Sequence, residues 1–208
     1  MTNGDIIFRV KAILDEEELG VTQADVELDN LIDIDRRIED EIAESVRELL
    51  EACPLKYTTD IAFTPNVTAF SDGTGYTPLP LDFLRLSSFK MKGWRKAVHN
   101  AIVENSADYE RQKYRATRGG CIKPVCAVVM DNGELILEYY TAPYNAPHVV
   151  EQSRYIPYPV KDEHGDWNID ARLFDALCWI VARNVAITFN SDRVKLLSEK
   201  MNEIMKTL

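Results

Sequence analysis

The side chains that most often carry catalysis or bind metals are few in this sequence and lie in unrelated contexts. None of the histidines has a second histidine or a cysteine at a spacing typical of zinc sites. No Gly-x-Ser-x-Gly motif is present, no cysteine has a recognisable histidine partner motif, and no glycine-rich segment continues into Gly-Lys-Ser/Thr. We therefore expect a protein that is not an enzyme, with no catalytic residue, no cofactor and no bound metal. The histidines are His99, His148 and His164, and the cysteines, which we expect to be free and mostly buried thiols, are Cys53, Cys121, Cys126 and Cys178.

Two acidic clusters have the residue types of a cation site. Asp29, Asp33 and Asp35 lack the central glycine and terminal glutamate of an EF-hand loop, so a solvated helix face is the favoured interpretation. Residues 162–166 contain three acids and a histidine, which is also the composition of an exposed polar turn. We expect neither cluster to bind a metal.

Charge is divided unevenly along the chain, whose formal net charge is -10. Residues 15–51 hold fifteen acids and three bases, whereas residues 85–124 hold ten bases and three acids. Opposed blocks suit head-to-tail contacts between copies or a basic face near nucleic acid, and they also fit two solvated faces. The candidate interface residues are the bases Arg111, Lys113, Arg115 and Arg118 and the acids Glu39, Glu41, Glu44 and Glu48.

Aromatic and basic residues alternate in residues 109–118, as they do on many nucleic-acid-binding surfaces. A nucleic-acid-binding module that uses the basic stretch 85–124 is therefore the alternative function. A short amphipathic helix with Tyr109 and Tyr114 packed on strands is the favoured interpretation, because the overall acidity opposes avid binding of phosphates.

The composition is that of a globular protein, with 46% hydrophobic and 28% charged residues in 208. No apolar run approaches the length of a membrane-spanning helix, and the first residues lack the pattern of a secretory signal. We expect a soluble protein made in a reducing compartment, with one core or one core carrying an inserted subdomain.

Helical periodicity marks both ends of the chain. Apolar residues recur at helical spacing in residues 6–14 and more clearly in residues 34–53, where Asp33 is the expected cap and Pro54 the expected stop. Towards the C-terminus, Asp170 is the expected cap of one helix, and residues 190–192 separate it from a last helix over 194–208.

Short β-branched and aromatic runs between residues 57 and 147 predict strands and turns. Asp131-Asn132-Gly133 predicts a hairpin between 126–130 and 134–140, because Asn-Gly readily adopts the positive φ angles of a tight turn. Further strands are expected at 67–70, 84–91 and 97–103, and a short helix over 106–115 with Ser106 as its cap.

These elements predict an α+β fold. Residues 1–56 and 161–208 are expected to form a helical bundle, and residues 57–160 an inserted β-rich subdomain. Its expected core contains Phe83, Leu84, Leu86 and Trp94.

The β-rich segment resembles the head-to-tail adaptor proteins of short-tailed phages, also called connector ring or tail tubular proteins. The resemblance rests on TPLPLDFLRL at 77–86, on Phe89-Lys90-Met91 and on GWRKAV at 93–98. The elements that follow also have the family's order: a polar helix, a hairpin ending in Thr141-Ala142-Pro143, and two C-terminal helices. The acidic, tyrosine-rich character is closer to the ring proteins of crAss-like phages.

This resemblance implies a structural virion protein. Such proteins form a homo-oligomeric ring, usually a dodecamer, beneath the portal protein, and continue the DNA ejection channel. Other tail ring or nozzle proteins assemble on that platform, and double-stranded DNA passes through without specific binding. The resemblance implies no membrane and a location in the phage tail connector, with assembly in the host cytoplasm.

Overall fold

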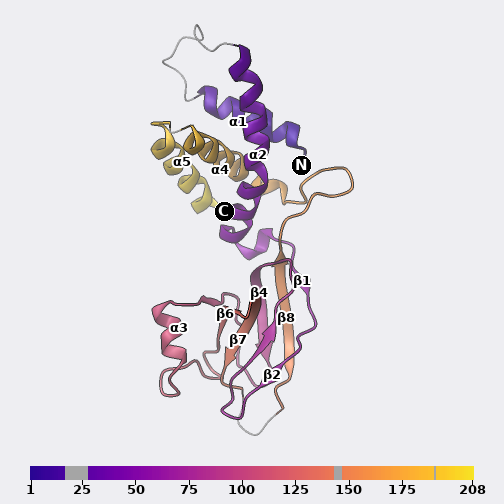
Figure 1. Cartoon of the computed structure of the whole chain (residues 1–208), viewed down its shortest axis with the longest axis vertical. Helices are drawn as coiled ribbons and strands as arrows, with labels where there is room; N and C mark the ends of the chain where they lie inside the picture. Colours follow the sequence, from indigo (N-terminus) through magenta and orange to yellow (C-terminus); the bar gives the residue numbers. More distant parts are fainter. Residues whose placement is uncertain (17–27, 143–146, 190) are drawn as a thin grey trace. The chain divides into compact units, whose positions relative to one another are not determined.

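The computed structural model describes residues 1–16, 28–142, 147–189 and 191–208, and side chains outside residues 15–33. The fold class is α+β, as the sequence predicts. The chain divides into two compact units, of which the first is helical and combines Met1–Thr58 with Pro159–Leu208 (Figure 1). The second, Thr59–Tyr158, is rich in strands, and its limits lie close to those of the expected insertion, residues 57–160.

The helical unit is built around α4 (Phe174–Thr188), which contacts α1 (Asn3–Glu16), α2 (Leu28–Ala52) and α5 (Val194–Thr207). A helix that is apolar over most of its surface is stable only when other helices cover it. The buried residues of α4 are Ala176, Leu177, Cys178, Ile180, Val181, Ala182, Val185 and Ala186. Among the described helices, none combines the length and the apolar character that crossing a bilayer requires.

The ends of the helices follow the predicted signals in part. Pro54 follows the end of α2 as expected, because proline has no N–H to continue the helix. Asp33 is not a cap, because α2 begins at Leu28 and the helix already includes that position. Asp170 accepts a hydrogen bond from the N–H of Arg172 at the start of the 3-10 turn Ala171–Leu173, which leads into α4. Asn190 lies outside the described residues.

The β-rich unit consists of two sheets. One sheet has the order β1-β8-β4 and the other the order β2-β3-β7-β6-β5. All pairings between these strands are antiparallel except that of β5 with β6. The strands are β1 (Ile61–Ala62), β2 (Thr68–Ala69), β3 (Gly75–Pro78), β4 (Phe83–Met91), β5 (Ile102–Val103), β6 (Val125–Asp131), β7 (Glu134–Tyr140) and β8 (Val150–Pro157).

One buried cluster joins the two sheets, with aromatic side chains from β4, β7 and β8 at its centre. Phe83, Leu86 and Trp94 belong to it, as predicted, with exposed fractions of 3–4%. Leu84 is only half-buried, so its assignment to this core is wrong. Successive side chains of a strand point to opposite faces, and Leu84 directly follows the buried Phe83.

The Asn-Gly hairpin forms where the sequence predicts it. β6 pairs with β7 across Asn132 and Gly133, whose φ angles are 48° and 87°. The expected strand over 97–103 is wrong in its middle: Val98 forms a single bridge back to Phe89 in β4, whereas β5 pairs with β6 of the other sheet. Residues 99–101 therefore connect the two sheets, which periodicity along the chain does not reveal.

The predicted polar helix is α3 (Ala107–Gln112), whose N-cap Ser106 accepts a hydrogen bond from the N–H of Tyr109 at 3.1 Å. Tyr109 is half-buried, as expected for an anchor. Tyr114 is 67% exposed, so its expected role as a second anchor is wrong. The helix ends at Gln112, and Tyr114 therefore does not continue its buried face.

Candidate interaction surface

The β-rich unit has one end at which the chain enters and leaves and an opposite end formed by loops. The chain enters and leaves it near the end of the sheet where Phe83 pairs with Pro157, and at the other end Met91 pairs with Val150. We call the loops at this second end the distal loops. Their described residues are 70–74, 92–98, 117–124, 141–142 and 147–149.

Hydrogen bonds connect the distal loops to one another. The backbone N–H of Arg95 donates to the carbonyl of Cys121 at 2.8 Å, and that of Lys92 donates to the carbonyl of Val149 at 2.7 Å. Trp94 is 3% exposed, and its indole N–H donates to the carbonyl of Thr141 at 3.0 Å. The backbone that carries the side chains of these loops is therefore fixed to the core.

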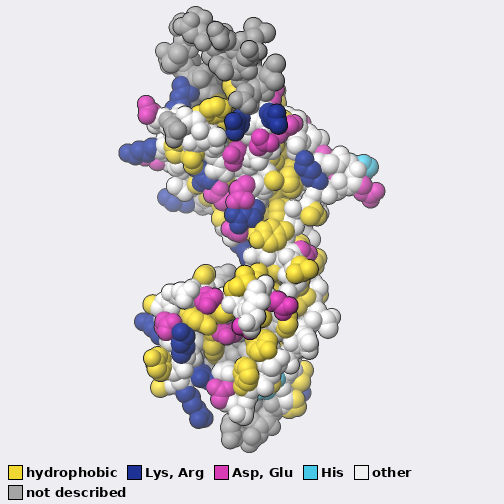
Figure 2. Space-filling model, viewed as in Figure 1, with side chains coloured by type: hydrophobic (Ala, Val, Ile, Leu, Met, Phe, Trp, Pro, Cys, Tyr) yellow, Lys and Arg dark blue, Asp and Glu magenta, His cyan; other side chains and the backbone are white. Residues whose placement is uncertain are grey.

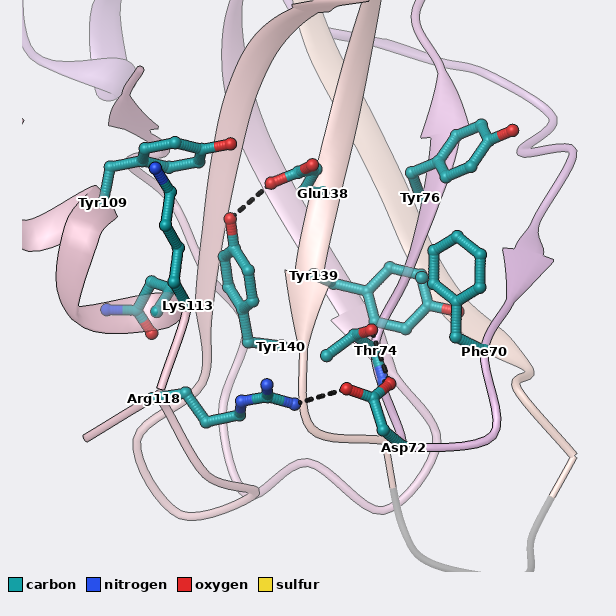
Figure 3. Close-up of a pocket in the computed structure, with 12 residues that line it drawn as sticks. Phe70, Asp72, Thr74, Tyr76, Tyr109, Lys113, Arg118, Glu138, Tyr139 and Tyr140 are labelled. Atoms are coloured by element: carbon teal, nitrogen blue, oxygen red, sulfur yellow. Dashed lines mark hydrogen bonds and ion pairs between the residues drawn. The ribbon is translucent and has the colours of Figure 1, made fainter. Parts of the chain in front are cut away.

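A pocket of about 200 Å³ lies between α3, β7 and the turn before β3 (Figure 3). Tyr109 and Lys113 come from the helical side, and Phe70 and Tyr76 lie across from them. Glu138 accepts a hydrogen bond from the hydroxyl of Tyr140 at 2.5 Å.

Two phenols of this pocket, those of Tyr109 and Tyr140, are weaker acids than a free tyrosine. Burial, and then the Glu138 carboxylate, raise the pKa of Tyr109 to about 12. Burial and the hydrogen bond to Glu138 also raise the pKa of Tyr140 far above its ordinary value. Both hydroxyls therefore remain protonated near neutral pH, where they act as hydrogen-bond donors and not as nucleophiles.

An ion pair forms at the rim of the same pocket. Arg118 donates to the Asp72 carboxylate at 2.9 Å, and the hydroxyl of Thr74 donates to the same side chain at 2.7 Å. These two hydrogen bonds, that of Thr74 first, lower the pKa of Asp72 to about 2. Gln112, which is buried, links α3 to the next loop by accepting a hydrogen bond from the N–H of Gly119 at 2.7 Å.

Three of the four basic interface candidates are neutralised by acids of the same chain. Arg111 pairs with Asp108 at 3.2 Å and Lys113 with Glu110 at 2.6 Å, and Figure 2 shows basic and acidic side chains beside one another over α3. The side chain of Arg118 is only 13% exposed and already pairs with Asp72, and its role as an interface residue stays a prediction. Arg115 alone is exposed and has no ion pair within the described residues.

Four other bases of the stretch 85–124 also lack an acidic partner, and the sequence analysis did not single them out. They are exposed, and none forms an ion pair within the ranges that the structure describes. The sequence does contain a signal for them, because none of the four has an acid within four residues along the chain. Arg111 and Lys113, by contrast, each follow an acid by three residues, which is the spacing of helical ion pairs. The unpaired distal cations, as we call them, are Lys92, Arg95, Lys96 and Lys123.

The acidic candidates on α2 also divide into two groups. Glu48 pairs with Arg183 of α4 at 2.5 Å and Glu41 accepts a hydrogen bond from Thr188 at 3.2 Å, so both hold helices together. The charge of Glu48 is already paired inside the unit, and its role as an intermolecular contact stays a prediction. Glu44 is exposed but paired with Arg47 of its own helix. Glu39 is exposed and has no hydrogen bond or ion pair within the described residues, and the same holds for its neighbour Asp40.

Metal-ligating residues do not converge in the part of the chain that the structure describes, where no group of three or more His, Cys, Asp or Glu side chains could hold an ion. Asp162 instead accepts hydrogen bonds from the backbone N–H groups of His164 and Asp166, as in an exposed polar turn. Asp35 pairs with Lys11, and the side chains of Asp29 and Asp33 lie outside the described residues. Comparison with models of known protein families and with curated proteins gives no match for this chain.

Proposed function

We propose that this protein is a structural subunit that assembles into a ring in the head-to-tail connector of a short-tailed phage. The ring would continue the DNA channel below the portal protein and support further tail proteins. The observation that carries the proposal is that the segments resembling the adaptor family hold both ends of the inserted unit together. Each of these short motifs therefore has a structural role in the β-rich unit.

The Leu-Pro-Leu-Asp-Phe segment fixes the end where the chain enters and leaves. The carbonyl of Asp82 accepts a hydrogen bond from the N–H of Tyr158 at 2.7 Å, and its carboxylate accepts one from the hydroxyl of Tyr155 at 2.7 Å. The ring of Phe83 stacks on that of Tyr155, with centroids 5.9 Å apart. The inserted unit therefore begins and ends at one reinforced junction.

The Gly-Trp segment, together with Thr141 and Ala142, fixes the distal end. Trp94 donates its indole N–H to Thr141, which has a positive φ of 74°, and the adjacent Ala142 is 3% exposed. A unit whose distal loops are fixed in this way is suited to repeated contacts between identical copies, because little conformational freedom is lost on binding.

The excess of acids supports a DNA channel that does not bind its cargo. A net charge of -10 for each copy repels phosphates. Without this repulsion, weak contacts from many copies would add up and slow the passage of DNA through the channel. In this proposal the protein has no turnover, binds no cofactor or membrane, and is part of the virion. Its partners are other copies of itself, the portal protein and neighbouring tail proteins.

A nucleic-acid-binding module remains the alternative function, and the unpaired distal cations favour it. Free monomers that bind duplex DNA with a steep salt dependence would support this alternative. The cations of α3 and its pocket do not favour it, because Arg111, Lys113 and Arg118 are paired with acids.

Negative-stain microscopy of the purified protein, alone and mixed with the portal protein of the same phage, tests the proposal. We expect closed rings of one size that stack coaxially on the portal. Particles that remain monomeric at every protein and salt concentration, with or without the portal, would contradict it.

A further inference from the structure

We propose that the unpaired distal cations bind the acidic surface of α2 around Glu39 and Asp40 in a second copy of the chain. The inference rests on the proposed self-assembly, because it names the two surfaces that would meet. Both surfaces consist of exposed residues whose charged side chains form no ion pair or hydrogen bond within the part of the chain that the structure describes.

The cationic surface is fixed in place before any partner arrives. Arg95 lies next to the buried Trp94, and its N–H is bonded to Cys121, two residues before Lys123. The N–H of Lys92 is bonded to Val149. Two separate loops therefore hold four like charges on one end of the unit, where their mutual repulsion is relieved by an acidic partner.

Acids near these loops are already engaged. Glu151 pairs with Lys90 at 2.8 Å, and Asp72 pairs with Arg118. Asp108 and Glu110 of α3 pair with Arg111 and Lys113. The positive charge of the distal loops thus remains uncompensated within the described part of their unit.

A second copy fits this surface better than duplex DNA does. The chain as a whole is acidic, with a net charge of -10, so every copy repels phosphates at long range and offers acidic surface to another copy's cations. Glu44 and Glu48 of α2 already pair with Arg47 of the same helix and Arg183 of α4, whereas Glu39 and Asp40 are exposed and have no ion pair within the described residues. A contact between two different surfaces can repeat from copy to copy, as ring closure requires.

Two charge reversals with a matched control test the contact. The cation variant is Arg95→Glu with Lys96→Glu. The control, Arg111→Glu with Lys113→Glu, changes the net charge equally at residues that are already paired. An acid variant, Glu39→Lys with Asp40→Lys, changes the other surface, and circular dichroism melts check that all three fold.

Sedimentation velocity across a salt series gives the dissociation constant of assembly for each variant. We expect the cation and acid variants each to weaken association about tenfold or more at low salt, as for the loss of complementary charge at an interface. The control should change it by less than about twofold, because exposed helical ion pairs contribute little. An equimolar mixture of the cation and acid variants should associate more tightly than either alone.

The possible failures are distinguishable. A wild type that never associates would contradict the proposed function itself. A wild type that assembles while the cation variant assembles equally well would overturn only this inference, and so would a mixture that fails to restore association. Loss of duplex DNA binding in a gel-shift titration of the cation variant, with association unchanged, would overturn it in favour of the nucleic-acid alternative.

Discussion

Trp94 is the single side chain on which the distal loops depend most. It is 3% exposed, packs edge-on against Phe89 with ring centroids 6.0 Å apart, and donates its indole N–H to Thr141. A tryptophan in this position joins the turn after β4 to the end of β7, which are far apart in the sequence. Its loss would leave both a cavity and an unpaired carbonyl.

We predict that Trp94→Ala lowers the free energy of unfolding of the β-rich unit by about 3–5 kcal/mol, the range for truncation of a fully buried large aromatic residue. Urea denaturation followed by far-ultraviolet circular dichroism measures the change. Tyr114→Ala is the matched control, because that side chain is 67% exposed, and it should change stability by about 0.5 kcal/mol or less. Equal stability of Trp94→Ala and wild type would show that the indole does not support this core.

The second prediction at this scale concerns Asp72. We expect a carboxyl titration by NMR to give a pKa of about 2, against an ordinary value of 3.8, because Thr74 and Arg118 hydrogen-bond to the charged form. A pKa that is lowered on folding means that the stabilisation is complete above pH about 4 and is lost as the pH falls through the folded value. Arg118→Gln should raise the pKa of Asp72 towards 3.8. A pKa that Arg118→Gln leaves unchanged would mean that this ion pair does not form in solution.

At the scale of elements, the β6–β7 hairpin contributes side chains both to the lining of the pocket and to the core between the sheets. Glu138 and Tyr140 of β7 face the pocket, whereas Cys126 and Leu137 belong to the cluster between the sheets. Its turn therefore sets the register of residues on both faces of the larger sheet.

We predict that Gly133→Ala destabilises the β-rich unit by about 1 kcal/mol, because φ at this position is 87° and an L-residue is strained there. A Cβ atom at Gly133 would meet no other atom within 4 Å, so the cost is conformational only. Gly120→Ala is the matched control, because its Cβ also meets nothing within 4 Å and its φ is not in the positive region. If the two variants melt at the same temperature, backbone strain does not determine the stability of this turn.

The elements that could be predicted from sequence are those whose signals are local. The apolar stripe from Ile38 in α2 to Cys53, directly after the helix, repeats at helical spacing and is buried. The Asn-Gly turn forms by its own backbone preference. The expected strand over 97–103 is wrong because its two ends pair with different sheets. Pairing between sheets depends on tertiary packing, which no single window of sequence contains.

The same distinction holds for the candidate surface. The pairs Asp108–Arg111 and Glu110–Lys113 follow from a spacing of three residues on a helix, so the charges that are neutralised there could be predicted. Arg118 and Asp72 are 46 residues apart, and their pairing follows only from the fold. Trp94 and Thr141 are 47 residues apart and are joined for the same reason.

At the scale of the whole molecule, acidic and basic residues are paired within each unit more fully than the sequence indicates. Among the described residues, Glu44 and Glu48 of α2 pair with Arg47 and Arg183, and Arg111 and Lys113 pair with acids of α3, whereas Glu39, Asp40 and the unpaired distal cations have no ion pair. Exposed pairs contribute only about 0–1 kcal/mol each, so a stable assembly also requires apolar contacts between copies. Exposed apolar residues are present on both units, for example Phe8 at 79% and Val103 at 71%.

Native mass spectrometry of the purified chain tests the central claim of self-assembly most directly. The proposed ring predicts one dominant species whose mass is a fixed multiple of the 23.7 kDa chain and does not grow with protein concentration. A species at 23.7 kDa alone, or an unlimited ladder of oligomers without a preferred size, would contradict the ring.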